Sequence, residues 1–91
     1  MTYTIRFSTQ IDWKRFSRLP KDQKVRIQGA IRQKLATDPH QFGKPLHNSP
    51  SSCRSLRIGD YRVIYRIEKR TVDIVLIGHR STIYDEVEGM L

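Results

Sequence analysis

Hydrophobic and polar residues alternate along residues 53–66 in two runs that meet at Gly59-Asp60. A two-residue Gly-Asp loop between β-branched and aromatic residues predicts a β-hairpin with a primed turn. Because side chains alternate across a strand, one hairpin face is predicted to be apolar and the other cationic. The apolar face carries Leu56, Ile58, Tyr61, Val63 and Tyr65, and the cationic face carries Arg57, Arg62 and Arg66.

This hairpin fixes which residues lie opposite each other. The predicted pairs are Ile58 with Tyr61, Arg57 with Arg62, Leu56 with Val63, and Ser55 with Ile64. Like charges directly opposite each other on two strands are mildly destabilising. The pair of arginines therefore indicates an anionic ligand on this face. The alternative is that these arginines are solvated charges on the surface of a very basic protein.

Before the hairpin, the pattern predicts one strand and two helices. Residues 3–8 alternate and are rich in β-formers, as in a strand, and residues 10–18 follow as a short helix capped by Ser8 or Thr9. Residues 21–36 have the apolar spacing of a longer helix, in which Gly29 is expected to pack closely against the sheet. The expected core stripes are Trp13, Phe16 and Leu19 in the first helix and Ile27, Ala30, Ile31 and Leu35 in the second.

The remaining segments are a loop, a strand and a terminal helix. Residues 38–52 contain three prolines and show no period, which is typical of a loop. Residues 71–80 are apolar on both faces, as in a central strand, and Lys69-Arg70 forms the turn before them. Ser81 or Thr82 is expected to cap a short helix whose hydrophobic and aromatic residues are Ile83, Tyr84, Val87 and Leu91.

These elements predict a single domain over residues 1–91, of the α+β class, in the order β-α-α-β-β-β-α. Two N-terminal helices pack on one face of an antiparallel sheet, which makes two layers. The other face of the sheet is then open. The arginines of the hairpin are expected on that open face.

The net charge of the chain indicates which class of partner it binds. The chain has a net charge of +8, and 11 of its 17 basic residues are arginine, whose planar fork matches phosphate. This balance indicates binding to a polyanion, most commonly nucleic acid. No apolar run approaches the roughly 20 residues of a membrane span. Cys53 is the sole cysteine, so no internal disulfide forms and a reducing compartment is expected.

The acidic residues are unevenly distributed. Residues 81–91 hold three acids and no base, whereas residues 1–80 hold all 17 bases and six acids. Two interpretations stay open: the acidic tail folds over the basic face as a lid, or it only caps the terminal helix.

Two motifs resemble those of a known family. The first motif is the run Leu56-Arg57-Ile58-Gly59-Asp60-Tyr61-Arg62-Val63-Ile64-Tyr65. The second is Ile77-Gly78-His79-Arg80, which is followed by Tyr84. Together they resemble the signature of the RelE/ParE superfamily of toxins from toxin–antitoxin pairs. The resemblance implies a small cytoplasmic protein with the microbial-RNase-like RelE fold. It also implies one of two activities: RelE-type members cut mRNA in the ribosomal A site without a metal, and ParE-type members poison DNA gyrase.

The resemblance assigns roles to individual residues. Arg62 matches the arginine that contacts the scissile phosphate, Arg80 the second catalytic arginine, and Tyr84 the C-terminal aromatic residue of RelE enzymes. RelE has lysines on the first hairpin strand where this chain has Cys53 and Ser55, and Arg54 or Lys44 is the candidate substitute. The expected RNA-binding residues are Arg57, Arg54, Arg66, Lys44 and His79.

RNA cleavage without a metal needs a base, an acid and cations that stabilise the phosphorane. Arginine suits only the last role because it stays protonated. Guanidinium neighbours favour the phenolate of Tyr84, which is therefore a candidate base, although it is equally suited to stack on an RNA base. His79 and Arg80 face opposite ways on an extended strand, and Arg80 is favoured as the one that enters the site. The three histidines and Cys53 lack the spacing of a zinc site, so no metal and no cofactor are expected.

The leading hypothesis is thus a ribosome-dependent mRNA endonuclease that inhibits translation. A ParE-like inhibitor of DNA gyrase and an inactive RelE-fold binding module are the alternatives. The expected partners are a small acidic antitoxin, the ribosome and mRNA, with operator DNA bound only by the toxin–antitoxin complex. No association with a membrane is expected.

Overall fold

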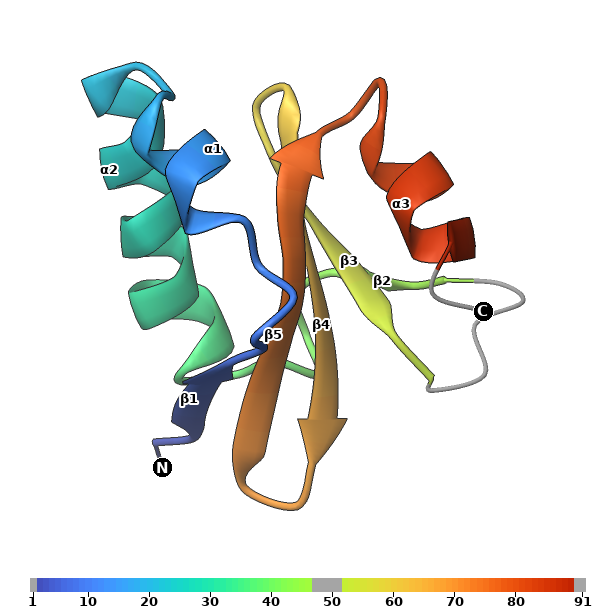
Figure 1. Cartoon of the computed structure of the whole chain (residues 1–91). Helices are drawn as coiled ribbons and strands as arrows, with labels where there is room; N and C mark the ends of the chain where they lie inside the picture. The colour runs from blue at the N-terminus through green and yellow to red at the C-terminus, as the bar shows by residue number, and fades with distance from the viewer. Residues whose placement is uncertain (1, 47–51, 90–91) are drawn as a thin grey trace.

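A computed structural model describes residues 2–46 and 52–89 of the chain. Five strands form one sheet in the order β1-β5-β4-β3-β2, with α1 and α2 against one face and α3 against the other (Figure 1). The elements in chain order are β1 (Thr4–Phe7), α1 (Trp13–Ser17), α2 (Lys21–Ala30), a π-helical turn η1 (Ile31–Leu35), β2 (Lys44–Pro45), β3 (Arg54–Ile58), β4 (Tyr61–Glu68), β5 (Thr71–His79) and α3 (Ile83–Gly89). The α+β class is confirmed, and no helix in the described part is long and apolar enough to cross a membrane.

The central hairpin is confirmed in its register. Arg57 lies opposite Arg62, and Ile58 lies opposite Tyr61, as the alternation predicts. Gly59 has a φ of 60°, whereas Asp60 has no positive φ, which matches a type II′ turn. The predicted apolar face joins the main core between the sheet and α2, together with Ile27, Ile31 and Leu35.

The sheet is mixed, so the prediction of an antiparallel sheet is wrong at one edge. β1 runs parallel to β5, with Thr4 opposite Thr71 and Phe7 opposite Ile74. Alternation within a strand carries no information about the direction of a distant neighbour, which explains the error. The loop at 38–52 also contains a strand, because Lys44 and Pro45 pair with Ser55 and Arg54. Two residues are too few to show a period, and residues 47–51 of that loop lie outside the described part.

The pattern predicts that the second face of the sheet is open, and this prediction is wrong. The helix α3 covers the middle of that face (Figure 1). Ile83 is fully buried over a second apolar cluster that contains Cys53, Ile64, Val75 and Leu76. A register shift helps to form this cluster: Ile64 pairs with Leu76 and Tyr65 with Ile74. Val75 therefore has no paired residue on β4, as in a β-bulge, and it packs with Leu76 on this face. The cationic face therefore survives only at its two ends.

The N-terminal helices differ from the prediction in their details. α1 begins at Trp13 because Asp12 is its N-cap, with Oδ1 accepting the Arg15 N–H at 3.0 Å, so neither Ser8 nor Thr9 caps it. Phe16 and Leu19 pack against the core, but Trp13 is 47% exposed. The expectation for Gly29 is wrong, since nothing outside its own helix and neighbours lies within 4 Å of a Cβ built there.

The terminal helix follows the prediction. The Thr82 carbonyl accepts the N–H groups of Asp85 and Glu86, which places Thr82 at the cap position. Val87 is partly buried beside Ile83, and Tyr84 is exposed. Leu91 lies outside the described residues.

Candidate nucleic-acid interface

A groove of about 820 Å³ lies between the loop before β2, the hairpin β3–β4 and α3. We call it the arginine groove, and its polar lining consists of Gln41, Lys44, Ser55, Arg57, Arg62 and Tyr84. The hairpin supplies Ser55, Arg57 and Arg62 because these residues point away from the main core. The structure thus gathers Lys44, Arg57, Arg62 and Tyr84 from four different elements.

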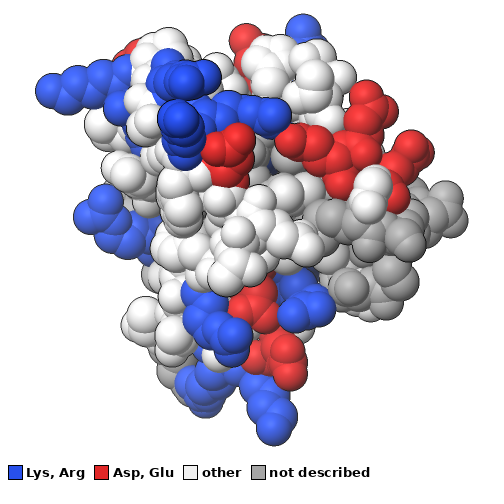
Figure 2. All heavy atoms as spheres, viewed as in Figure 1, with Lys and Arg blue, Asp and Glu red and all other residues white. Residues whose placement is uncertain are grey.

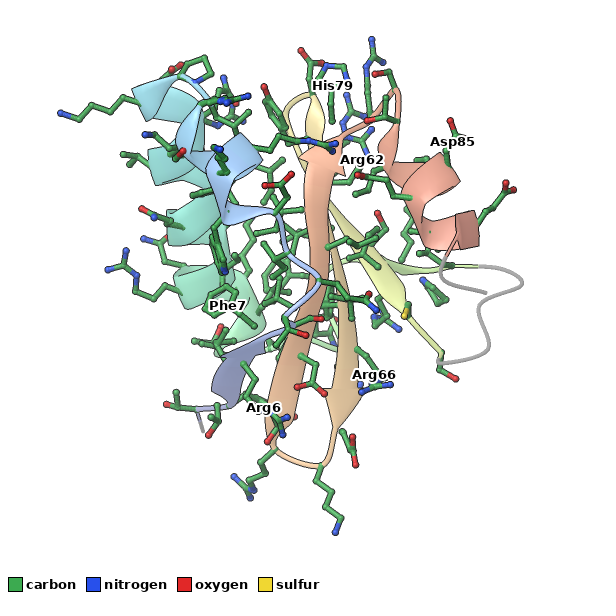
Figure 3. All side chains as sticks on the ribbon, viewed as in Figure 1. Arg6, Phe7, Arg62, Arg66, His79 and Asp85 are labelled. Carbon is green, nitrogen blue, oxygen red and sulfur yellow. The ribbon has the colours of Figure 1, made fainter. Side chains whose placement is uncertain are left out.

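Arg62 is held in place by the hairpin turn. Its Nη1 donates to the carbonyl oxygens of Gly59 and Tyr61, at 3.1 and 3.0 Å. Its other nitrogens donate to no described residue. Figure 3 shows Arg62 at the end of the sheet near the β3–β4 turn. A half-buried guanidinium with a fixed orientation next to exposed Arg57 makes a preorganised site for an anion.

Tyr84 reaches the groove from α3. Its hydroxyl lies 3.5 Å from the hydroxyl of Ser55, and its side chain is 43% exposed. Ser55 is also the residue opposite Lys44 in the β2–β3 pair. Ser55 therefore lies next to a cation from the neighbouring strand and to the Tyr84 phenol.

Arg80 does not line the groove but lies at the same end of the sheet. Its backbone N–H donates to the Asp60 carbonyl at 2.8 Å, and its Nε lies 3.7 Å from Asp60 Oδ1. The Arg80 side chain is largely exposed. Arg80 therefore contacts the same turn as Arg62 while facing solvent.

Arg54 is directed into the protein and not into the groove. Its Nη2 donates to the carbonyl oxygens of His40 and Gly43, both at 3.0 Å. The fully buried Tyr65 hydroxyl lies beside it and contacts the carbonyl oxygens of Pro39 and Phe42. Burial raises the pKa of Tyr65, and the nearby Arg54 opposes that rise.

The contacts of Arg54 and Tyr65 hold the loop that precedes β2. This loop supplies Gln41 and Phe42 to the groove and leads directly into Lys44 of β2. Sequence reasoning missed the first two of these residues and missed the anchoring role of Tyr65, which it placed in the core. The available signal was the hydroxyl of a tyrosine on the core face, because a buried tyrosine hydroxyl usually needs a hydrogen-bond partner.

Arg66 and His79 lie away from the arginine groove. Arg66 and Arg6 flank Asp73, with nitrogen–oxygen distances of 3.3 and 3.4 Å, at the opposite end of the sheet from Arg62 (Figure 3). His79 packs edge-on against Tyr61 on the α1 side, and its Nδ1 accepts the Ser81 N–H at 3.1 Å. The strand alternation had predicted that His79 and Arg80 face opposite ways.

The acidic residues of the tail, Asp85, Glu86 and Glu88, do not line the groove. Figure 2 shows acidic side chains gathered over α3, and Glu86 pairs with Arg15 of α1 at 2.7 Å. No ion pair joins these acids to Arg57 or Arg62 within the described residues. This arrangement favours a capping role over a lid. In residues 2–46 and 52–89, no group of three His, Cys, Asp or Glu is placed to hold a metal.

Comparison with known proteins identifies the class. Residues 8–84 match the model of the ParE toxin of type II toxin–antitoxin systems, parDE. Toxin RelG of Mycobacterium tuberculosis is 37% identical over 86 residues, which cover 92% of this chain and 98% of that protein. Toxin RelE of the same organism is 44% identical over 52 residues, which span 55% of this chain and only 54% of that protein.

Solved structures agree with this class. The RelBE2 toxin–antitoxin complex from M. tuberculosis contains a chain with a TM-score of 0.76 and 32% identity, and the match covers 88% of this chain and all of that one. The isolated E. coli RelE toxin has a TM-score of 0.66 at 22% identity, over 98% and 99% of the two chains, and supports the fold alone. The chain belongs to the RelE/ParE toxin superfamily, and it is a toxin of a type II toxin–antitoxin system.

Proposed function

We propose that this toxin cleaves mRNA in the A site of translating ribosomes, without a metal. The observation that carries the proposal is the arginine groove, in which Tyr84 shares one surface with Lys44, Arg57 and Arg62. RNA cleavage needs a proton-transferring group and fixed cations at the same phosphate, and the groove offers both. The curated relatives with RelE and RelG names support the same choice.

In this reaction the ribose 2′ oxygen attacks phosphorus while the bond from phosphorus to the 5′ oxygen breaks. The phenol oxygen of Tyr84 accepts the 2′ proton, and Arg62 with Arg57 stabilises the charge that develops on the phosphorane. Lys44 is the groove cation able to give a proton to the leaving 5′ oxygen, because arginine does not release its proton. Arg80 assists by leaving Asp60 and turning toward the phosphate.

The test is primer extension on a model transcript, with and without translating ribosomes. The wild-type chain is expected to cut within codons only when ribosomes are present. In the Arg62→Ala, Arg80→Ala double variant, the cleavage rate should fall by about 100-fold or more, because the variant lacks the cations that stabilise the transition state. Arg6→Ala is the matched control, because Arg6 lies outside the groove. A double variant that cuts like the wild type would end the proposal.

We also propose that a small acidic antitoxin neutralises this toxin in the cytoplasm. The chain carries a net charge of +8, and the related RelBE2 structure is a toxin–antitoxin complex. Operator DNA is then bound only by the complex of both proteins. Co-expression with a short acidic protein encoded beside the toxin should relieve the growth arrest that the toxin causes alone, and absence of any such relief would contradict this partner.

A ParE-like inhibitor of DNA gyrase is the second candidate, because the family model that matches carries the ParE name. This function has no need of proton transfer by Tyr84. Cleaved DNA trapped on gyrase, together with intact mRNA, would select it. Overexpression without growth arrest would instead select an inactive binding module.

A further inference from the structure

Tyr84 sits on a helix that depends on its surroundings for its position. α3 has seven residues, and isolated helices of that length are unstable in water. Its apolar anchors are Ile83 and Val87, which pack on the second cluster. These contacts hold the helix down, but two apolar anchors leave its tilt over the sheet weakly defined.

A second attachment fixes α3 from the other side of the molecule. Arg15 of α1 places Nη1 2.7 Å from Glu86 Oε1. α1 and α3 lie on opposite faces of the sheet (Figure 1), so this ion pair passes over the end of β5. It is the one ion pair between α3 and another element in the described part of the chain.

Apart from Arg15, the Glu86 carboxylate has few interaction partners among the described residues. Its Oε2 is buried and accepts no hydrogen bond from residues 2–46 and 52–89. A Cβ at Gly78 would lie 3.1 Å from this oxygen and 2.8 Å from Ile83 Cδ1. Glu86 is thus packed against the bare backbone of Gly78, and Arg15 is its sole charged partner among the described residues. The Glu86 side chain is 32% exposed, so without Arg15 it can turn its carboxylate into water, because the buried Oε2 would otherwise keep a charged group without a partner.

We propose that Arg15 and Glu86 form a clasp across the end of the sheet that sets the position of α3 and so of the Tyr84 hydroxyl. The inference rests on the proposed function, in which that hydroxyl moves a proton. Both members are positioning residues, since neither lines the arginine groove. Lys44, Arg57 and Arg62 come from the sheet, so the clasp controls the chemical step and not RNA binding.

The first test measures cleavage at saturating ribosomes. Arg15→Gln and Glu86→Gln should each slow cutting by about 10- to 100-fold, because a displacement near 1 Å is enough for such a loss. The ribosome concentration for half-maximal cutting should stay the same. Arg15→Lys should recover most of the rate, because the pair uses a single nitrogen–oxygen contact that an ammonium group also makes. The control is Arg6→Gln, which removes another largely exposed arginine from an ion pair at the opposite end of the sheet.

A double-mutant cycle separates this role from a general loss of structure. In a Tyr84→Phe background, Arg15→Gln should cause no further loss of rate, because the group that it positions is absent. An equal loss in both backgrounds would overturn the clasp. So would a wild-type rate in Arg15→Gln.

A structural measurement decides the clasp even if the wild-type chain proves not to cut RNA. In NMR spectra, Arg15→Gln should remove the cross-peaks between the Tyr84 ring and Ser55 while the hairpin amides keep their protection from exchange. Retention of those cross-peaks would contradict the clasp. Absence of cleavage by the wild type would contradict only the proposed function.

Discussion

Two tyrosines of this chain have opposite surroundings, and the difference decides what each can do. Tyr84 keeps its phenol in the open groove beside Ser55. Tyr65 is fully buried, and its phenol is occupied by the carbonyl oxygens of the loop before β2. At the scale of residues, one phenol is available for chemistry and the other fixes the wall of the groove.

Replacing Tyr84 by phenylalanine removes the proposed base but keeps the ring. We expect cleavage to fall about 100-fold or more, as for loss of a general base, while ribosome binding changes little. Single-turnover cleavage and ribosome co-sedimentation measure the two quantities. A large loss of binding with normal cleavage of the bound RNA would show that the ring stacks on a base instead.

Replacing Tyr65 by phenylalanine removes a buried donor. The carbonyl of Pro39 then loses its 2.8 Å partner, and we expect the free energy of unfolding to fall by about 1–3 kcal/mol. Thermal or urea melts measure this loss. A Tyr65→Phe variant that melts at the wild-type temperature would show that water replaces the hydroxyl.

The same tyrosine predicts a dependence of stability on alkaline pH. Its pKa is raised in the folded state, mainly by burial, so the folded chain holds the proton more tightly than the unfolded chain. The stabilisation is complete below the unfolded value near 10 and is lost as the pH rises through the folded pKa. Urea melts between about pH 8 and pH 11 should show this fall in the wild type and a weaker one in Tyr65→Phe.

At the scale of elements, two glycines show how packing sets the outcome of the same substitution. Gly78→Ala would press on Ile83 and Glu86, and we expect a loss of about 1–3 kcal/mol together with displacement of α3. Gly29→Ala meets no neighbouring element within 4 Å, and we expect a gain of up to about 1 kcal/mol from helix propensity. Melting both variants beside the wild type tests the pair, and similar shifts in one direction would contradict the packing described here.

Local patterns predicted the elements well where their contacts are local. The turn at Gly59-Asp60, the pairing of Arg57 with Arg62 and the core face of the hairpin all follow from alternation and turn chemistry. The parallel position of β1, the two-residue β2 and the bulge at Val75 do not, because each depends on a partner that is distant in the sequence. The same limit applies to the site. The strand pattern predicts on which face of the sheet Arg66 lies, but it does not predict the ion pair of Arg66 with Asp73.

At the scale of the whole molecule, a net charge of +8 makes any binding to RNA sensitive to salt. We expect the logarithm of the binding constant to fall linearly with the logarithm of salt concentration. Lys44→Gln and Arg57→Gln should each reduce that slope by about one phosphate contact. Arg66→Gln should leave it unchanged, because Asp73 occupies Arg66. Filter binding to a short oligonucleotide between about 50 and 200 mM salt measures the slopes, and a reduced slope for Arg66→Gln would place RNA at both ends of the sheet.

The parallel pairing of β1 with β5 also constrains how the chain assembles. Thr4 meets Thr71, so the first strand finds its neighbour only when most of the chain has been synthesised. Such distant pairing slows folding because a long loop must close first. The strand β5 and the helix that carries Tyr84 follow all other described elements along the chain, so a nascent toxin acquires its proposed cutting surface only after the rest of the sheet has been synthesised.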